Sequence, residues 1–238
     1  MINYLSSKII KIINYFERGI NYMKKIASFI LLLNVFFLYA QDISVKINRK
    51  HEIHDHKIFV SYYSSELKNP LVVIWRLTAE NAIKSEQVNN RTNNFRKCGN
   101  NTLSGKSFGS VYDRGHMCPN NDYDFSEETA STTFLMCNMS PQFKGLNRGS
   151  WKTWEEKAHL YAKKYGHIDI CCGTIFLEIK EYNTKENETL ILPTQFFKIF
   201  YNKESKFMKC FIFNQSYEEP KECKIEDIEK LANVKFSF

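Results

Sequence analysis

The sequence lacks a run of apolar residues long enough to cross a lipid bilayer. Its longest apolar run follows Met23-Lys24-Lys25, covers residues 26–39 and contains two polar interruptions. These 14 residues fall short of the roughly 20 that a transmembrane helix needs. A transmembrane span is therefore not predicted, although an uncleaved membrane anchor is the alternative.

The same run is typical of a secretory signal peptide. Lys24 and Lys25 form a basic start, and Leu38 and Ala40 would occupy the −3 and −1 positions of a cleavage site. The residues before this basic start are either upstream sequence or a long n-region. We therefore expect residues 1–40 to be a prefix and signal peptide. The mature chain is then secreted or periplasmic, without stable membrane association.

The expected mature chain also lacks a strong net charge. The whole sequence carries +7, but residues 1–40 hold five basic residues against one acidic residue. The remaining 28 basic and 25 acidic residues leave only +3. Net charge is thus weak evidence for a polyanionic partner, and any attraction must come from the local placement of charges.

No cysteine pair shows the C-x-x-C spacing of a structural zinc site. All seven cysteines follow residue 40, and in an oxidising compartment this favours disulfides, with at least one thiol left over. The adjacent Cys171 and Cys172 would strain the backbone if they paired with each other. His51, His54 and His56 form a second cluster whose spacing suits neither a helix face nor a strand face. We favour a polar run over a metal site for them.

No internal repeat is present, and 43% hydrophobic residues are enough for a sizeable core, so we expect one domain over residues 41–238. A hairpin is predicted at 58–63 and 71–77, with its turn at 68–70, and a long polar loop at 79–110. Helical spacing appears at 126–135, 151–165 and 225–231, and further strand patterns at 168–176, 196–201 and 207–213. Because strands and helices do not alternate regularly, the pattern indicates an α+β fold.

The most informative residues are Asp113-Arg114-Gly115-His116, with Asn147 and Glu155 further along the chain. A neutral imidazole can deprotonate water near neutral pH, and an amide oxygen can hold a hydrated divalent cation. Each residue also has an ordinary structural explanation. His116 could be a structural histidine, Asn147 a helix cap and Glu155 a solvated helix charge. Together they indicate metal-assisted cleavage of phosphodiesters.

Three segments carry a resemblance to a known family: Asp113-Arg114-Gly115-His116, Asn138-Met139-Ser140-Pro141-Gln142 and Leu146-Asn147-Arg148-Gly149-Ser150-Trp151. In order and spacing they resemble the DNA/RNA non-specific endonucleases, and the likeness extends over about residues 54–238. The resemblance implies a central antiparallel sheet with flanking helices, which carry a ββα-metal finger active site.

The resemblance also implies roles for individual residues. His116 would be the general base, and Asn147 the direct protein ligand to Mg²⁺, with Mn²⁺ as an alternative ion. Glu155 would hold a metal-bound water and assist protonation of the leaving group. Arg114 would contact phosphate, and Asn138 would support the site by hydrogen bonding.

Further substrate contacts are expected from arginines. A loop arginine should clamp phosphate, and the sequence does not choose between Arg91 and Arg96. Arg148 is a third candidate for substrate binding. The chain departs from many relatives at Met117-Cys118-Pro119, which places a cysteine beside the site.

These features predict an exported, Mg²⁺-dependent endonuclease that cleaves DNA and RNA to 5′-phosphate and 3′-hydroxyl ends. No element for reading bases stands out, so contact should be with the backbone and weaken with salt. If the enzyme attacks competitors, an inhibitor protein is an expected partner. The alternatives are a catalytically silent relative that only binds nucleic acid or a protein, and a phosphodiesterase for small substrates.

Overall fold

The computed structural model describes residues 41–238 except positions 89, 107, 109–111, 185–186 and 217. The expected prefix and signal peptide at 1–40 lies outside the described residues. Among the helices that are described, none is long and apolar enough to cross a membrane.

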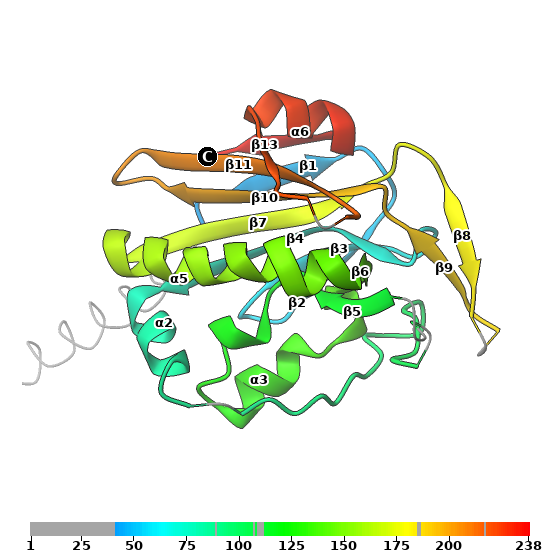
Figure 1. Cartoon of the computed structure of the whole chain (residues 1–238), viewed down its shortest axis with the longest axis horizontal. Coiled ribbons are helices and arrows are strands. Elements are labelled where there is room, and N and C mark those ends of the chain that lie inside the picture. Colours follow the sequence, from blue (N-terminus) through cyan, green and yellow to red (C-terminus); the bar gives the residue numbers. More distant parts are fainter. Residues whose placement is uncertain (1–40, 89, 107, 109–111, 185–186, 217) are drawn as a thin grey trace, which may run out of the picture. The chain divides into compact units, whose positions relative to one another are not determined.

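A seven-stranded sheet organises the described part of the chain (Figure 1), in the order β12-β11-β10-β7-β4-β3-β2 with every neighbouring pair antiparallel. Its strands are β2 Glu52–Asp55, β3 Val60–Ser64, β4 Asn69–Thr78, β7 His167–Ile175, β10 Gln195–Asn202, β11 Phe207–Asn214 and β12 Lys221–Glu222. Three two-stranded pairs join β1 Ser44–Ile47 to β13 Val234–Ser237, β5 Tyr112–His116 to β6 Met139–Phe143, and β8 Lys180–Asn183 to β9 Thr189–Leu192.

Helices cover both faces of the sheet (Figure 1), with α5 on one face and α6 on the other. The α-helices are α2 Ala79–Ser85, α3 Glu127–Thr133, α4 Lys144–Leu146, α5 Lys152–Tyr165 and α6 Ile225–Ala232. Short turns of other helix types are η1 Asn120–Asp122, η2 Met136–Asn138 and η3 Asn147–Trp151. The predicted α+β fold with a central antiparallel sheet and flanking helices is confirmed.

The two-residue period of the strands divides the core into two layers. In β4, Trp75 packs with Trp154 of α5, whereas its neighbour Ile74 packs with Ile228 of α6. Successive side chains of a strand point to opposite faces, so a strand covered on both sides must be apolar throughout. Each large side chain buried in this way contributes roughly 1.5–3 kcal/mol. The core therefore fixes the register that places the site.

The predicted hairpin is confirmed, but its turn lies earlier than expected. The turn comprises residues 65–68, and Asn69 and Pro70 already belong to β4. Lys68 adopts the positive φ of 52° that closes the turn. Asn69 is buried and donates hydrogen bonds to the carbonyls of Leu67 and Ile191. Those bonds hold the residue in the strand, and this overrides its turn propensity.

The predicted loop at 79–110 was wrong at its start, where α2 forms. The Thr78 hydroxyl accepts a hydrogen bond from the Asn81 backbone N–H and so caps the helix. Glu80 and Lys84 pair one turn apart, and Ala82 is buried. The helical signal was only seven residues long, which explains why the polar composition around it concealed it.

The disulfide expectation is confirmed by one pair, Cys98–Cys137. The other five cysteines are free. Cys171 and Cys172 are neighbours in β7, and they point to opposite sheet faces, one into each core layer. They are therefore separated by the strand and do not bond to each other.

Candidate active site

His116 ends strand β5, where the backbone runs close to β6. Gly115 pairs with Ser140, and a Cβ on this glycine would collide with the side chain of Gln142. A larger residue at this position would therefore displace the Gln142 side chain, which packs over the glycine. The His116 ring packs edge-on against Phe134, with ring centroids 4.9 Å apart, and lies 5.9 Å from the ring of Phe95. These contacts hold the imidazole in a single orientation.

The charge state of His116 follows from its surroundings. The residue is only 9% exposed, and its Nε2 has no hydrogen-bond partner among the described residues. Burial, together with the positive charges of Arg91 and Arg114, lowers the pKa of His116 to about 3. The imidazole is thus neutral near neutral pH. A buried nitrogen without a partner costs free energy, and a water or substrate oxygen would relieve that cost.

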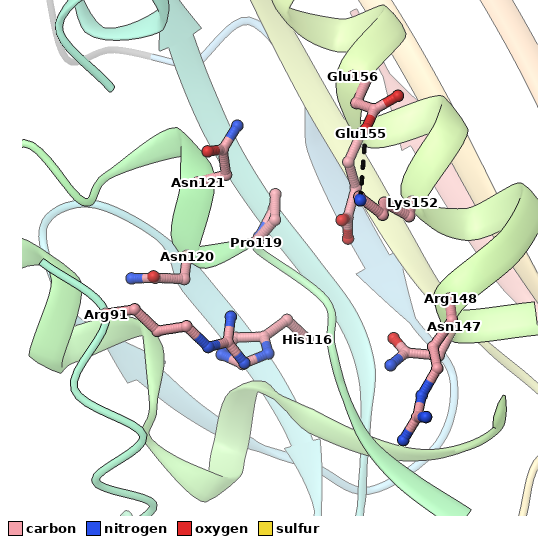
Figure 2. A pocket seen from close by; sticks show the side chains of 10 residues that line it. All are labelled: Arg91, His116, Pro119, Asn120, Asn121, Asn147, Arg148, Lys152, Glu155 and Glu156. Carbon is pink, nitrogen blue, oxygen red and sulfur yellow. Dashed lines mark ion pairs between the residues drawn. The ribbon is translucent and has the colours of Figure 1, made fainter. Parts of the chain in front are cut away.

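Asn147 lies in the turn that leads into α5. This turn is π-helical and contains Gly149 at φ −106° and ψ −115°, outside helical values. The Asn147 amide nitrogen donates to Oδ2 of Asp113 at 3.0 Å, which fixes the orientation of the amide. Its oxygen consequently faces the pocket (Figure 2). Trp151 Nε1 donates to the His116 carbonyl at 3.1 Å and ties the turn to the histidine strand.

Asp113 is the residue that orients this side of the site. It receives two hydrogen bonds from Arg148, both of 2.8 Å, as well as the bond from Asn147. Burial acts to raise the pKa of Asp113, but the bonds from Arg148 and Asn147 outweigh it and leave the pKa below its ordinary value. Asp113 is therefore a stable carboxylate. The Arg148 side chain, 67% exposed, is held by this ion pair at the rim of the pocket.

Glu155 projects from the first turn of α5 into the same pocket (Figure 2). Burial raises the pKa of Glu155 to about 7, against the lowering effect of Lys198. Lys198 is itself buried, with Nζ 3.8 Å from the Trp151 ring. A carboxyl with a pKa near neutrality can both accept and donate a proton at neutral pH.

One pocket of about 590 Å³ brings these groups together. Its lining residues are Arg91, His116, Pro119, Asn120, Asn121, Asn147, Arg148, Lys152, Glu155 and Glu156. The amide oxygen of Asn147 and the carboxylate of Glu155 are oxygen ligands of the kind that Mg²⁺ prefers, and an ion that keeps most of its waters needs few of them. The pocket thus combines a neutral imidazole, side-chain oxygens of the kind that bind Mg²⁺, and cationic side chains.

Three predicted residues lie outside the pocket lining: Asn138, Arg114 and Arg96. Asn138 is fully buried and exchanges two hydrogen bonds of 2.8 Å with the backbone of Cys118, just after His116. Arg114 stacks over the Phe95 ring at 3.9 Å and donates to the Gly105 carbonyl. Asn138 therefore positions the segment that carries His116. The positive charge of Arg114 helps to lower the pKa of His116.

The two candidate loop arginines have different surroundings. Arg91 lines the pocket, with its guanidinium carbon 5.3 Å from the Phe134 ring. Arg96 donates two hydrogen bonds to Ser131, at 2.9 and 2.7 Å, and is not among the pocket residues. The structure thus separates two residues that the sequence left equivalent.

The sequence reasoning missed the charged groups behind Glu155. Lys198 lies in β10 within the apolar segment 196–201, and an isolated lysine in a buried strand was the available signal. Asp122 and His159 form a second buried pair, 2.9 Å apart, whose spacing of 37 residues gives no sequence signal. Both features influence the pKa of Glu155.

Comparisons with known proteins agree on one family. The family model described as DNA/RNA non-specific endonuclease matches residues 40–238. The mitochondrial nuclease of Saccharomyces cerevisiae is 31% identical over 166 residues, which cover 63% of this chain and 50% of that protein. Human mitochondrial endonuclease G is 28% identical over 99 residues, covering 38% of this chain and 33% of that protein.

A solved structure, the EndoG/EndoGI complex, shares the fold with a TM-score of 0.62 at 21% identity. The match covers 78% of this chain and 85% of that one. The chain spans about half the length of the mitochondrial nucleases of Saccharomyces cerevisiae and Schizosaccharomyces pombe that it matches.

Proposed function

The chain belongs to the DNA/RNA non-specific endonuclease family, as its motifs predicted, and we propose that it hydrolyses phosphodiester bonds in DNA and RNA. One observation carries the proposal. The buried Nε2 of His116, which has no partner among the described residues, lies in the same pocket as the Asn147 amide and the Glu155 carboxylate. A general base whose nitrogen has no other partner can accept the proton of an attacking water.

His116 takes a proton from the attacking water. Its neutral form is favoured by burial and by the positive charges of Arg91 and Arg114. A phosphate group in the pocket would offset those positive charges and so make the imidazole a stronger base at the moment of attack. In-line displacement then releases the 3′ oxygen and leaves a 5′-phosphate end.

Asn147 would hold a divalent cation, Mg²⁺ or Mn²⁺, through its amide oxygen. An ion held there would supply positive charge for the phosphate and the departing oxygen. The fit rests on the hydrogen bond from the amide nitrogen to Asp113, which leaves the oxygen for the ion. Glu155, whose pKa burial raises to about 7, holds a proton for the leaving oxygen and orients water.

Arg91 is the arginine that clamps the substrate phosphate in this proposal, because it lines the pocket and Arg96 is directed to Ser131. Arg148 adds positive charge at the rim, and Arg114 acts at longer range. Asn138 positions the segment that carries His116. Because these contacts address the backbone, cleavage should depend on salt and show little sequence preference.

Residues 1–40 are proposed to direct export, which the basic pair and apolar run support. N-terminal sequencing of the protein from the culture supernatant or periplasm would test this, and a mature N-terminus at Gln41 is expected. Recovery of the full-length chain inside the cell would contradict export. An inhibitor protein is also proposed as a partner. The solved neighbour, EndoG, was determined with EndoGI, and pull-down from the producing cell tests the idea here.

The decisive assay incubates purified chain with plasmid DNA and with RNA, with and without EDTA. Digestion of both, blocked by EDTA and restored by Mg²⁺, is expected. His51→Ala is the matched control for a His116→Ala variant, because His51 packs on Tyr62 outside the pocket lining. Binding without digestion would instead identify a silent relative. If the chain neither binds nor digests nucleic acid, a phosphodiesterase for small substrates is favoured instead.

A further inference from the structure

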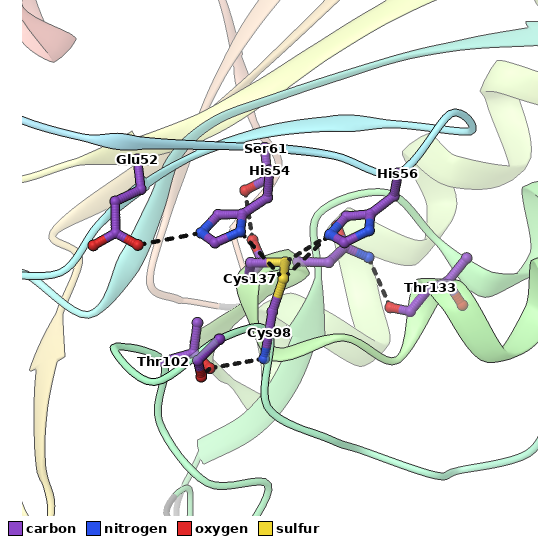
Figure 3. Close-up of a disulfide and its surroundings, with 10 residues drawn as sticks. Glu52, His54, His56, Ser61, Cys98, Thr102, Thr133 and Cys137 are labelled. Carbon is purple, nitrogen blue, oxygen red and sulfur yellow. Dashed lines mark hydrogen bonds and ion pairs between the residues drawn. A yellow bond between two sulfur atoms is a disulfide. The ribbon is translucent and has the colours of Figure 1, made fainter.

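A cluster of sulfur and imidazole groups lies outside the active-site pocket (Figure 3). His54 and His56 both turn towards Cys98 and Cys137, and all four ligand atoms lie within 4.8 Å of one another. His54 belongs to β2 and His56 follows it by two residues, so both project from the same side of the strand. The spacing of His51, His54 and His56 conceals this pair, because His51 points to Tyr62 instead.

The distances within the cluster match those of a tetrahedral metal site. His56 Nε2 lies 3.2 Å from the Cys98 sulfur and 3.4 Å from the Cys137 sulfur, and His54 Nδ1 lies 3.5 Å from the Cys98 sulfur. With zinc–sulfur and zinc–nitrogen bonds of about 2.3 and 2.05 Å, sulfur and nitrogen ligands of one tetrahedral ion stand about 3.6 Å apart. The sulfur–nitrogen distances thus suit one zinc ion, and the two sulfurs, joined here in the disulfide, would move apart to admit it.

The next layer of residues resembles the support that zinc ligands receive. His54 faces the sulfurs with Nδ1, and its Nε2 is 3.6 Å from a carboxylate oxygen of Glu52. At this distance the two groups do not form a hydrogen bond, but a carboxylate that accepts the proton of a ligating imidazole would fix its tautomer and orientation. Glu52 in turn accepts a hydrogen bond of 2.6 Å from Asn101. A disulfide uses neither histidine, so it does not account for this arrangement.

We propose that His54, His56, Cys98 and Cys137 form a structural Zn²⁺ site when the two cysteines are reduced. The site replaces the disulfide and uses the same pair of sulfurs. A dithiol reductant supplies two electrons and two protons to cleave the S–S bond, and is itself oxidised to a disulfide. Zn²⁺ then binds the two sulfurs as thiolates, and their two protons pass to water.

The ion would connect three segments, whereas the disulfide connects two. Cys98 belongs to the loop that carries Arg91, and Cys137 directly precedes Asn138. His54 belongs to edge strand β2, and His56 directly follows the end of that strand. The site thus anchors the loop beside the pocket in a reducing environment, as the disulfide does in an oxidising one. The inference does not depend on nuclease activity.

Metal content and thiol protection test the proposal directly. The full chain is purified with a dithiol reductant and Zn²⁺, separated from excess metal, and assayed for zinc. One zinc per chain is expected, with Cys98 and Cys137 protected from alkylation until a chelator is added. Co²⁺ in place of Zn²⁺ should give the thiolate-to-cobalt absorption band, which an oxygen site at Asn147 cannot produce.

Variants assign the ligands and keep the test open to failure. His54→Ala and His56→Ala should each lower zinc affinity at least 10-fold. Glu52→Gln should lower zinc affinity by at most roughly 100-fold. His51→Ala and Cys210→Ser are controls and should bind like the parent chain. If a histidine variant does not fold, the cobalt spectrum of the parent chain still decides. Zinc-free reduced protein with alkylated Cys98 and Cys137, or zinc retained by both histidine variants, would overturn the proposal.

Discussion

Two buried histidines lie near the same pocket, and their surroundings give them different charge states. His116 faces the positive charges of Arg91 and Arg114, and its pKa falls to about 3. His159 lies 2.9 Å from the Asp122 carboxylate. Burial acts to lower the pKa of His159, but the hydrogen bond and charge of Asp122 outweigh it and raise the pKa.

The difference shows that burial alone does not determine what a histidine does. The two residues are 9% and 4% exposed, so solvent access is nearly equal. His159 and Asp122 satisfy each other, and Asp122 also accepts a 2.7 Å bond from Trp75 Nε1. His116 Nε2 has no such partner within the described residues. His159 therefore has a structural role, whereas the His116 imidazole is available for chemistry.

Replacing His116 should break the chemistry and spare the fold. His116→Ala removes the base, and we expect plasmid cleavage to fall roughly 10²–10⁴-fold. The melting temperature should fall only modestly, because the lost packing against Phe134 is partly offset by removal of a buried nitrogen that has no partner among the described residues. Cleavage rate and thermal unfolding of the same sample measure both effects. Cleavage at the parent rate would exclude His116 as the base.

Replacing Asp122 should instead destabilise the fold. Asp122→Ala leaves His159 and the Trp75 N–H without their buried acceptor. Breaking one side of a buried pair typically lowers the free energy of unfolding by about 3–5 kcal/mol. Urea unfolding measures this loss. A stability equal to that of the parent chain would show that the pair is not structural.

The Asp113 carboxylate should affect the metal rather than the base. Asp113→Asn weakens the group that orients the Asn147 amide, so we expect the Mg²⁺ concentration for half-maximal cleavage to rise roughly 10–100-fold. Glu156→Gln is the matched control, because Glu156 also lines the pocket but pairs with Lys152 at 3.8 Å. An unchanged Mg²⁺ requirement in Asp113→Asn would contradict the proposed orienting role.

The smallest expected effect is a pH dependence of stability from His159. Its pKa in the folded chain lies above the ordinary 6.5, so its pair with Asp122 stabilises the fold fully below pH 6.5. This contribution is lost as the pH rises through the folded pKa. The stability difference between the parent chain and His159→Gln should therefore shrink with rising pH. A difference that grows instead would mean that His159 is neutral in the folded chain.

The residues that line the pocket could be predicted from the sequence, whereas the buried residues that contact them from behind could not. His116, Asn147 and Glu155 stand in motifs whose order and spacing are visible along the chain, and all three line one pocket. The partners that set their pKa values come from distant strands. Lys198 reaches Glu155 only through the packing of β10 against α5, and no local pattern encodes that contact.

The same limit applies to the cysteines and to the fold. Strands β3, β4, β7, β10 and β11 of the sheet were predicted because apolar runs are local signals, whereas the short strands β2 and β12 were not. The pairing of Cys98 with Cys137 and the approach of His56 across 81 residues depend on how those elements assemble. The capped helix α2 was missed because its seven residues lie in polar sequence.

Histidine titration by NMR tests the central contrast most directly. The ring signals of His116 and His159, assigned with His116→Ala and His159→Gln, are followed as the pH is lowered through 6.5 in the metal-free chain. We predict that His116 stays neutral well below pH 6.5, while His159 is already protonated there. If His116 titrates at or above 6.5, or His159 is neutral at that pH, the division between a catalytic and a structural histidine is wrong.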